Sequence, residues 1–237
     1  DNNNNNNNNN VWTKYSSSQL AQLDELTEDY KRFLDQGKTE RECVREAVRL
    51  ARKAGFIDLD QAIAQGTQLK AGDKVYRICM KKALALFILG SDPLEKGMRI
   101  LGAHIDSPRL DLKQKPLYED TQMAYLDTHY YGGIKKYHYV AMPLALHGVV
   151  CKPDGTTVTI NVGEDDNDPV FFVSDLLIHL AQDQMKKSAS DVIEGENLDI
   201  TIGSRPLEGE DKDAVKAAVL KLLKDKYDID EDDFISA

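Results

Sequence analysis

Hydrophobic positions in the first quarter of the chain recur at helical spacing. Between residues 17 and 36 the leucines and aromatic residues fall three or four positions apart, which predicts an amphipathic helix. A cluster of serines stands where its N-cap belongs, and Gly37 is placed to end it. A second helix begins at Thr39, because Thr39 and Glu42 have the spacing of a capping box. A short helix is expected over residues 59–64.

The period then changes to one typical of strands. Residues 75–80 and 83–89 read as two strands, and the apolar residues 100–103 read as a third, buried on both faces. This third run ends abruptly in a polar stretch, residues 104–108. Helices followed by such strands predict a helix-covered α/β sheet.

After Pro116 the chain becomes rich in β-prone residues separated by turn signals, which predicts a second, β-rich α+β part. The expected strands lie at 124–131, 137–152 (one long or two short), 156–162 and 198–203. A helix is expected to start near Ser174 and to carry Leu176, Leu177, Leu180 and Ala181, and another is expected over 212–227. We therefore expect domains at 11–114 and 115–237. Residues 1–10, Asp1 and nine asparagines, are a low-complexity or placeholder segment outside the fold.

Composition restricts the possible partners. The chain has 237 residues, of which 41% are hydrophobic and 30% charged, so it can build a core and a soluble surface. A net charge of −10 argues against nucleic acid and anionic membranes as partners. No apolar run reaches the roughly 20 residues of a membrane helix, and no signal peptide is visible. Three widely spaced cysteines suit a reducing compartment, so we expect a cytoplasmic protein.

His104 and Asp106 are the first candidates for chemistry. Residues two apart in a strand point the same way, so this imidazole and carboxylate would emerge together beyond a strand end. One could bind a metal ion while the other orients it. The commoner alternative is a hydrogen-bonded, partly buried histidine. A catalytic zinc ion also needs about three protein ligands, and no other histidine forms a close pair with His104.

Other readings of the polar residues are weaker. His129 and His138 could be ordinary surface, His147 is expected to be structural, and His179 lies among apolar residues typical of core packing. Ser107 lies too close in sequence to His104 and Asp106 for a catalytic triad to form in series. The chain has no nucleophile elbow, no P-loop and no dinucleotide-binding glycine motif.

Two motifs carry a family resemblance. LGAHIDSPRLDLK (residues 101–113) and THYYGGIKKY (residues 128–137) closely resemble the aspartyl aminopeptidase family of di-zinc metallopeptidases, and most of all its bacterial aminopeptidase I branch. The resemblance implies that His104 is a zinc ligand and that Asp106 orients the site. It also implies that His179, in the sequence Ile-His-Leu, contacts substrate or transition state in the active site of a neighbouring subunit.

The resemblance also implies a reaction and a fold. Two zinc ions would activate a water molecule that removes acidic or neutral N-terminal residues from peptides. The fold would be the first part of the di-zinc aminopeptidase sheet, followed by an inserted dimerisation domain. Homo-oligomers built from dimers, often dodecamers, are implied as well. The family's remaining metal ligands and its general base have no match here, so the chain resembles an N-terminal half and would be inactive alone. The alternative is a non-catalytic oligomerisation or regulatory module.

Overall fold

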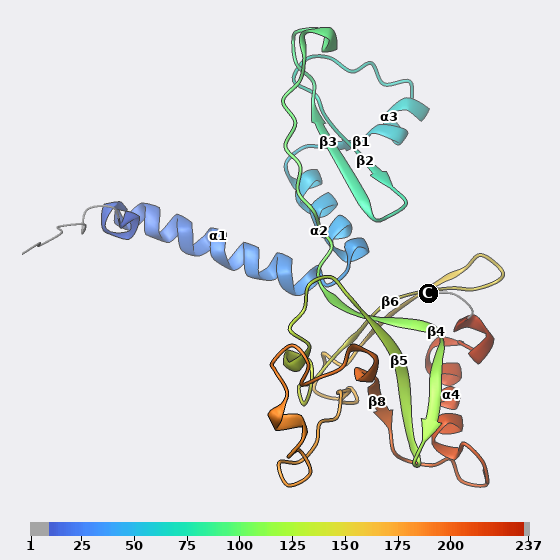
Figure 1. The fold of residues 1–237 in the computed structure, drawn as a ribbon. Helices are drawn as coiled ribbons and strands as arrows, with labels where there is room; N and C mark the ends of the chain where they lie inside the picture. Colours follow the sequence, from blue (N-terminus) through green and yellow to red (C-terminus); the bar gives the residue numbers. More distant parts are fainter. Residues whose placement is uncertain (1–9, 235–237) are drawn as a thin grey trace, which may run out of the picture. The chain divides into compact units, whose positions relative to one another are not determined.

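The computed structural model describes residues 10–234 and divides them into two compact units (Figure 1). Unit 1 runs to Asp106 and unit 2 begins at Ser107, and each is described by itself. The whole is a mixed α/β structure with small sheets. Within the described part of the chain, every helix is too short or too polar to cross a membrane.

Unit 1 begins with helices whose caps are readable in the sequence. Ser16 accepts a hydrogen bond from the Gln19 N–H at 3.3 Å, and Thr39 accepts one from the Glu42 N–H at 3.4 Å. Both are reciprocal capping boxes, so the predicted helices are confirmed. The elements of unit 1 are η1 (Val11–Lys14), α1 (Ser17–Gln36), α2 (Glu40–Lys53), β1 (Ile57–Asp58), α3 (Leu59–Ala64), β2 (Lys74–Cys79), β3 (Ala83–Ile88) and η2 (Leu94–Lys96).

A small core holds unit 1 together. The strands form a three-stranded sheet in the order β1-β2-β3, and α2 packs on it. Val44 and Val48 of α2 meet the fully buried Tyr76 of β2, and Ile105 packs against the same cluster. Helix α1, by contrast, has no buried residue. The buried core of unit 1 therefore lies between α2 and the sheet, and α1 adds no buried residue to it.

The predicted strand over residues 100–103 is wrong. Residues 98–108 have no regular secondary structure, and the side chains of Ile100 and Leu101 are 79% and 100% exposed. A strand buried on both faces needs hydrogen-bonding neighbours and covering layers. Nothing in the described residues pairs with this segment, so its local apolar pattern is insufficient.

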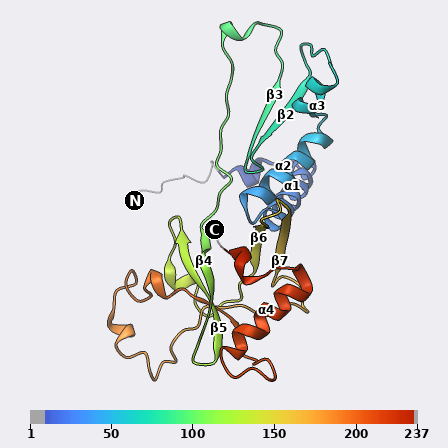
Figure 2. The ribbon, with the colours of Figure 1, turned by 90° about the vertical axis from the view of Figure 1, so that its right-hand side faces the viewer.

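Unit 2 is built on a second three-stranded sheet, in the order β4-β5-β8, beside a β6-β7 hairpin. Helix α4 packs along the β4-β5-β8 sheet (Figures 1 and 2). The elements of unit 2 are β4 (Arg109–Asp120), β5 (Met123–Tyr131), η3 (Lys136–His138), β6 (Leu146–Cys151), β7 (Thr157–Val162), η4 (Gln184–Lys186), η5 (Gly195–Asn197), β8 (Ile200–Gly203), α4 (Ala214–Tyr227) and η6 (Glu231–Phe234).

Strand β4 was not expected at this length. It crosses the anticipated boundary at residue 114, because its pairing with β5 continues on both sides of Pro116. The register shifts between Leu112 and Leu117, which accommodates a residue that cannot donate to the ladder. Pairing with β5 therefore keeps the whole of residues 109–120 in one sheet.

The predicted helix near Ser174 is also wrong. Residues 174–183 contain two turns and no helix, and Leu176, Leu177 and Leu180 are 54%, 71% and 70% exposed. An amphipathic helix of this length depends on burying its apolar face, and no described element covers this one. The Asp175 carboxylate accepts instead from the Leu176 N–H at 2.8 Å and from the Gln184 amide at 2.9 Å. The prediction of one long or two short strands over residues 137–152 is only partly met, because a strand forms only at β6.

Helix α4 is capped by a residue from a distant strand. Its N-cap Asp213 makes no side-chain cap, and the Glu119 carboxylate accepts from the Val215 and Lys216 N–H groups at 2.9 Å each. We expect Glu119→Ala to lower the free energy of unfolding by about 1–2 kcal/mol, since it removes a cap and a favourable charge at the helix N-terminus. Urea unfolding measures this, with Glu210→Ala as the exposed control. Equal midpoints for the two variants would contradict the capping role.

An ion pair joins the β6-β7 hairpin to the end of α4. The Lys152 ammonium lies 2.8 Å from the Asp228 carboxylate and, with Lys224, lowers the pKa of Asp228 to about 2. The stabilisation is therefore present above the ordinary carboxyl pKa and is lost as pH falls through about 2.

We expect Asp228→Asn to lower the melting temperature at pH 7 and to differ progressively less from the wild type between pH 4 and pH 2. Asparagine suits the left-handed φ of +52° at this position, so the charge alone changes. Thermal unfolding across this pH range measures the effect. Asp225→Asn, which breaks an exposed pair within α4, is the control. A deficit that stays constant with pH would exclude the ion pair as its cause.

Candidate functional site

One partly buried side chain anchors the segment that carries His104 and Asp106. Ile105 packs against the core cluster of unit 1, including Val44 and Tyr76. Its neighbours on either side are turned outward, so that the His104 side chain is 84% exposed and that of Asp106 is 39% exposed. The sequence thus predicted the paired direction of these residues correctly, although no strand forms here. Ile105 was not singled out from the sequence.

The His104 ring is held by its own segment. Its Nδ1 lies 3.0 Å from the backbone carbonyl oxygen of Asp106 and 3.3 Å from the Asp106 carboxylate. A neutral imidazole that donates from Nδ1 has its lone pair on Nε2, which is the arrangement of a metal-binding histidine. The geometry therefore suits His104 as a metal ligand and Asp106 as the group that orients it.

The described residues do not complete a metal site. Among them, no group of three or more histidine, cysteine, aspartate or glutamate side chains could hold a metal ion. A catalytic zinc ion takes about three protein ligands and a water molecule. His104 therefore fits zinc as one ligand only, and the ligand shortage noted in the sequence persists in the structure.

His179 lies in unit 2, on a turn over residues 178–180. It is exposed, so the core-packing interpretation does not hold. Its apolar neighbours are exposed as well, with Leu177 at 71% and Ile178 at 64%. His179 thus belongs to an exposed apolar segment, where its side chain is accessible.

The other histidines have structural surroundings. The His147 side chain is only 9% exposed on β6, and its Nε2 lies 3.2 Å from the Glu164 carboxylate. The ring of His129 stacks on Tyr130, and that of His138 meets Tyr137 edge-on. These contacts agree with the ordinary strand and surface roles expected from the sequence.

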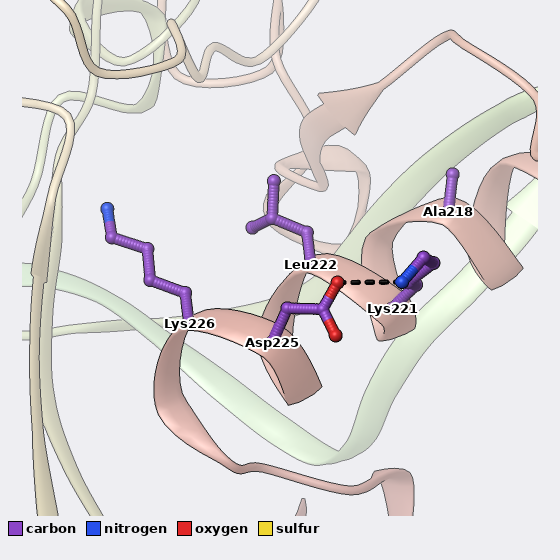
Figure 3. Close-up of a pocket in the computed structure, with 5 residues that line it drawn as sticks. All are labelled: Ala218, Lys221, Leu222, Asp225 and Lys226. Carbon is purple, nitrogen blue, oxygen red and sulfur yellow. Dashed lines mark hydrogen bonds and ion pairs between the residues drawn. The ribbon is translucent and has the colours of Figure 1, made fainter.

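A shallow hollow lies on the outer side of α4 (Figure 3). It is lined by Ala218, Lys221, Leu222, Asp225 and Lys226, and Lys221 and Asp225 form an ion pair of 2.7 Å across it. None of the candidate residues lies there. The hollow is therefore no substitute for the site around His104.

Sequence reasoning missed one polar cluster. The Lys113 ammonium lies 2.9 Å from the carboxylates of both Asp127 and Glu196. The hydrogen bonds to Glu196 and Asp127 raise the pKa of Lys113, and Lys113 in turn lowers the pKa of Glu196. Because Lys113 and Glu196 are 83 residues apart, no local signal could reveal their contact.

Known proteins resemble the chain over nearly its whole length. The family described as aminopeptidase I zinc metalloprotease (M18) matches residues 33–237. A probable M18 family aminopeptidase 1 of Clostridium acetobutylicum is 57% identical over 228 residues, which cover 96% of this chain and 49% of that protein. The chain spans about half the length of the curated relatives it matches.

Solved structures agree with this match. The crystal structure of an M18 aminopeptidase from Thermotoga maritima superposes with a TM-score of 0.87 at 42% identity, over 96% of this chain and 48% of that one. Aminopeptidase I from Clostridium acetobutylicum gives 0.83 at 56% identity, over 96% and 50%. A yeast relative solved as a dodecamer shares the fold at 15% identity, with a TM-score of 0.59 over 91% and 47%. The sequence motifs, the fold and these relatives agree, and the chain belongs to the M18 family of aminopeptidases, of which it represents an N-terminal half.

Proposed function

We propose that this chain forms the N-terminal half of a zinc aminopeptidase that removes N-terminal residues from peptides. The observation that carries the proposal is the M18 family match over residues 33–237. The motifs at residues 101–113 and 128–137, which resemble aminopeptidase I, agree with this family match. The other metal ligands and the general base come from the part of M18 aminopeptidases that this sequence does not cover.

His104 is the zinc ligand contributed by this chain. Its exposed ring and its bonded Nδ1 support binding through Nε2. When bound, zinc supplies a polarising charge and an activated water molecule. Asp106 acts on the ring, because its carbonyl and carboxylate fix the tautomer and the orientation of the imidazole.

His179 contacts the substrate in the active site of a neighbouring subunit. Support comes from its exposure on an apolar loop, where Leu177, Ile178 and Leu180 are each more than half exposed. Exposed apolar surface of this kind is typical of protein interfaces. The protein accordingly works as a homo-oligomer built from dimers, as the dodecameric assembly of the yeast relative suggests.

We expect His104→Ala to abolish aminopeptidase activity of the complete enzyme and to remove one tightly bound zinc ion, while the melting temperature of the apo-protein stays unchanged. The ring is 84% exposed, so its loss costs little packing. Activity, metal analysis and thermal unfolding measure the three effects. His138→Ala, an exposed histidine of unit 2, should change none of them. Normal turnover by His104→Ala would remove this residue from the site.

The action of His179 in a neighbouring subunit is tested by mixing His104→Ala, which we expect to be inactive, with His179→Ala, which we expect to have impaired catalysis and normal assembly. His104→Ala and His179→Ala protomers, combined under exchange conditions, form mixed dimers in which one of the two sites is intact. Random pairing then restores about a quarter of wild-type activity, given twofold symmetry. If His179 acted within its own subunit, every site in a mixed dimer would lack one histidine. Mixtures no more active than the separate variants would therefore contradict the proposal.

A further inference from the structure

The loop that carries His179 is long, and among its residues only Ala181 and Ile193 are buried. It runs over residues 174–197, between Val173, which is 1% exposed, and the fully buried Leu198. It contains turns and two short 3-10 helices, η4 and η5, and Leu177, Ile178 and Leu180 beside His179 are exposed. Such a segment samples many conformations unless other contacts restrain it.

The exit of the loop is fastened to the β4-β5 hairpin by an ion-pair cluster. Lys113 on β4 lies 2.9 Å from Asp127 on β5 and 2.9 Å from Glu196 on η5. The side chain of Lys113 is only 34% exposed. Because Asp127 already holds this ammonium on the strand, Glu196 meets a partner of fixed position and loses less entropy on binding it.

Close packing fixes the same point. A Cβ atom on Gly195 would lie 2.5 Å from the ring of Tyr130, so any other residue here would force that ring to shift. The buried Thr128 hydroxyl donates to the Leu198 carbonyl at 2.7 Å just beyond. The sheet and the exit of the loop are thus connected by a hydrogen bond to the backbone, by packing against the Tyr130 ring and by an ion pair.

Further contacts connect the exit with the turn of His179. Glu194 pairs with Lys187 at 3.1 Å, which brings both sides of the loop together. The Gln184 amide donates to Asp175 at 2.9 Å and closes the turn that contains His179. Within that turn the Leu180 N–H donates to the Leu177 carbonyl at 2.8 Å.

We propose that Lys113 and Glu196 are positioning residues for His179. The Lys113–Glu196 pair holds the exit of the loop on the sheet, and the contacts inside the loop carry this restraint to the turn. This inference rests on the proposed role of His179 in the aminopeptidase. Neither residue touches the substrate, and both act through the order of the loop.

Amide hydrogen exchange on the chain itself tests the restraint. We expect Lys113→Met and Glu196→Gln each to raise exchange over residues 175–187 about two- to fivefold, the range set by breaking one partly exposed ion pair. Exchange in β5 should not change. Lys113→Arg, which keeps the charge, should retain wild-type exchange. Asp183→Asn, which breaks an exposed pair with Lys186 in the same loop, is the matched control.

Two results would overturn the inference in different ways. Unchanged exchange over residues 175–187, or an equal rise in β5, would mean that the pair does not restrain the loop. In the complete enzyme, the same two variants should lower kcat without raising KM. Faster loop exchange with an unchanged kcat would mean that the order of the loop does not matter for the reaction. The exchange result stands even if the chain proves not to serve an aminopeptidase.

Discussion

Pairing of β5 along both of its edges is the interaction on which unit 2 depends. The strand bonds to β4 on one side and to β8 on the other, although β8 follows some seventy residues later in the chain. Asp199, immediately before β8, accepts from the Thr128 N–H at 3.2 Å and from the Tyr118 hydroxyl at 2.6 Å. Burial of the Tyr118 hydroxyl is the main cause that raises its pKa, and the hydrogen bond to the Asp199 carboxylate raises it further. The hydroxyl therefore stays protonated and remains a donor. The pairing of β8 with β5 therefore fixes the position where the His179 loop returns to the sheet.

Local signals in the sequence were sufficient where the structure is determined locally. The helices α1 and α2 have capping boxes within four residues, and α3 and α4 begin and end near the expected residues. Strands β2 and β3 are neighbours in sequence and pair across a short turn, so this hairpin is also recognisable from local sequence. These elements need little from the rest of the chain to be recognised.

Two failures of the sequence prediction involve exposed apolar segments. Residues 100–103 lack strand neighbours, and residues 174–181 lack a surface that covers Leu176 and Leu177. In each case the pattern correctly indicates a segment suited to burial, and burial depends on partners that no local window contains. The same two segments border or carry His104 and His179. The candidate functional residues therefore lie where apolar surface remains uncovered in the described chain.

The two histidines also differ in how their orientation is achieved. His104 needs only its next two neighbours, because Ile105 anchors the segment and the carbonyl of Asp106 binds Nδ1. Every contact in that arrangement lies within unit 1. His179 depends on contacts between Lys113 and Glu196, 83 residues apart, and on the folding of the whole β4-β5-β8 sheet. A motif search can therefore find the first residue and its geometry, whereas the second acquires a defined position only through the tertiary structure of unit 2.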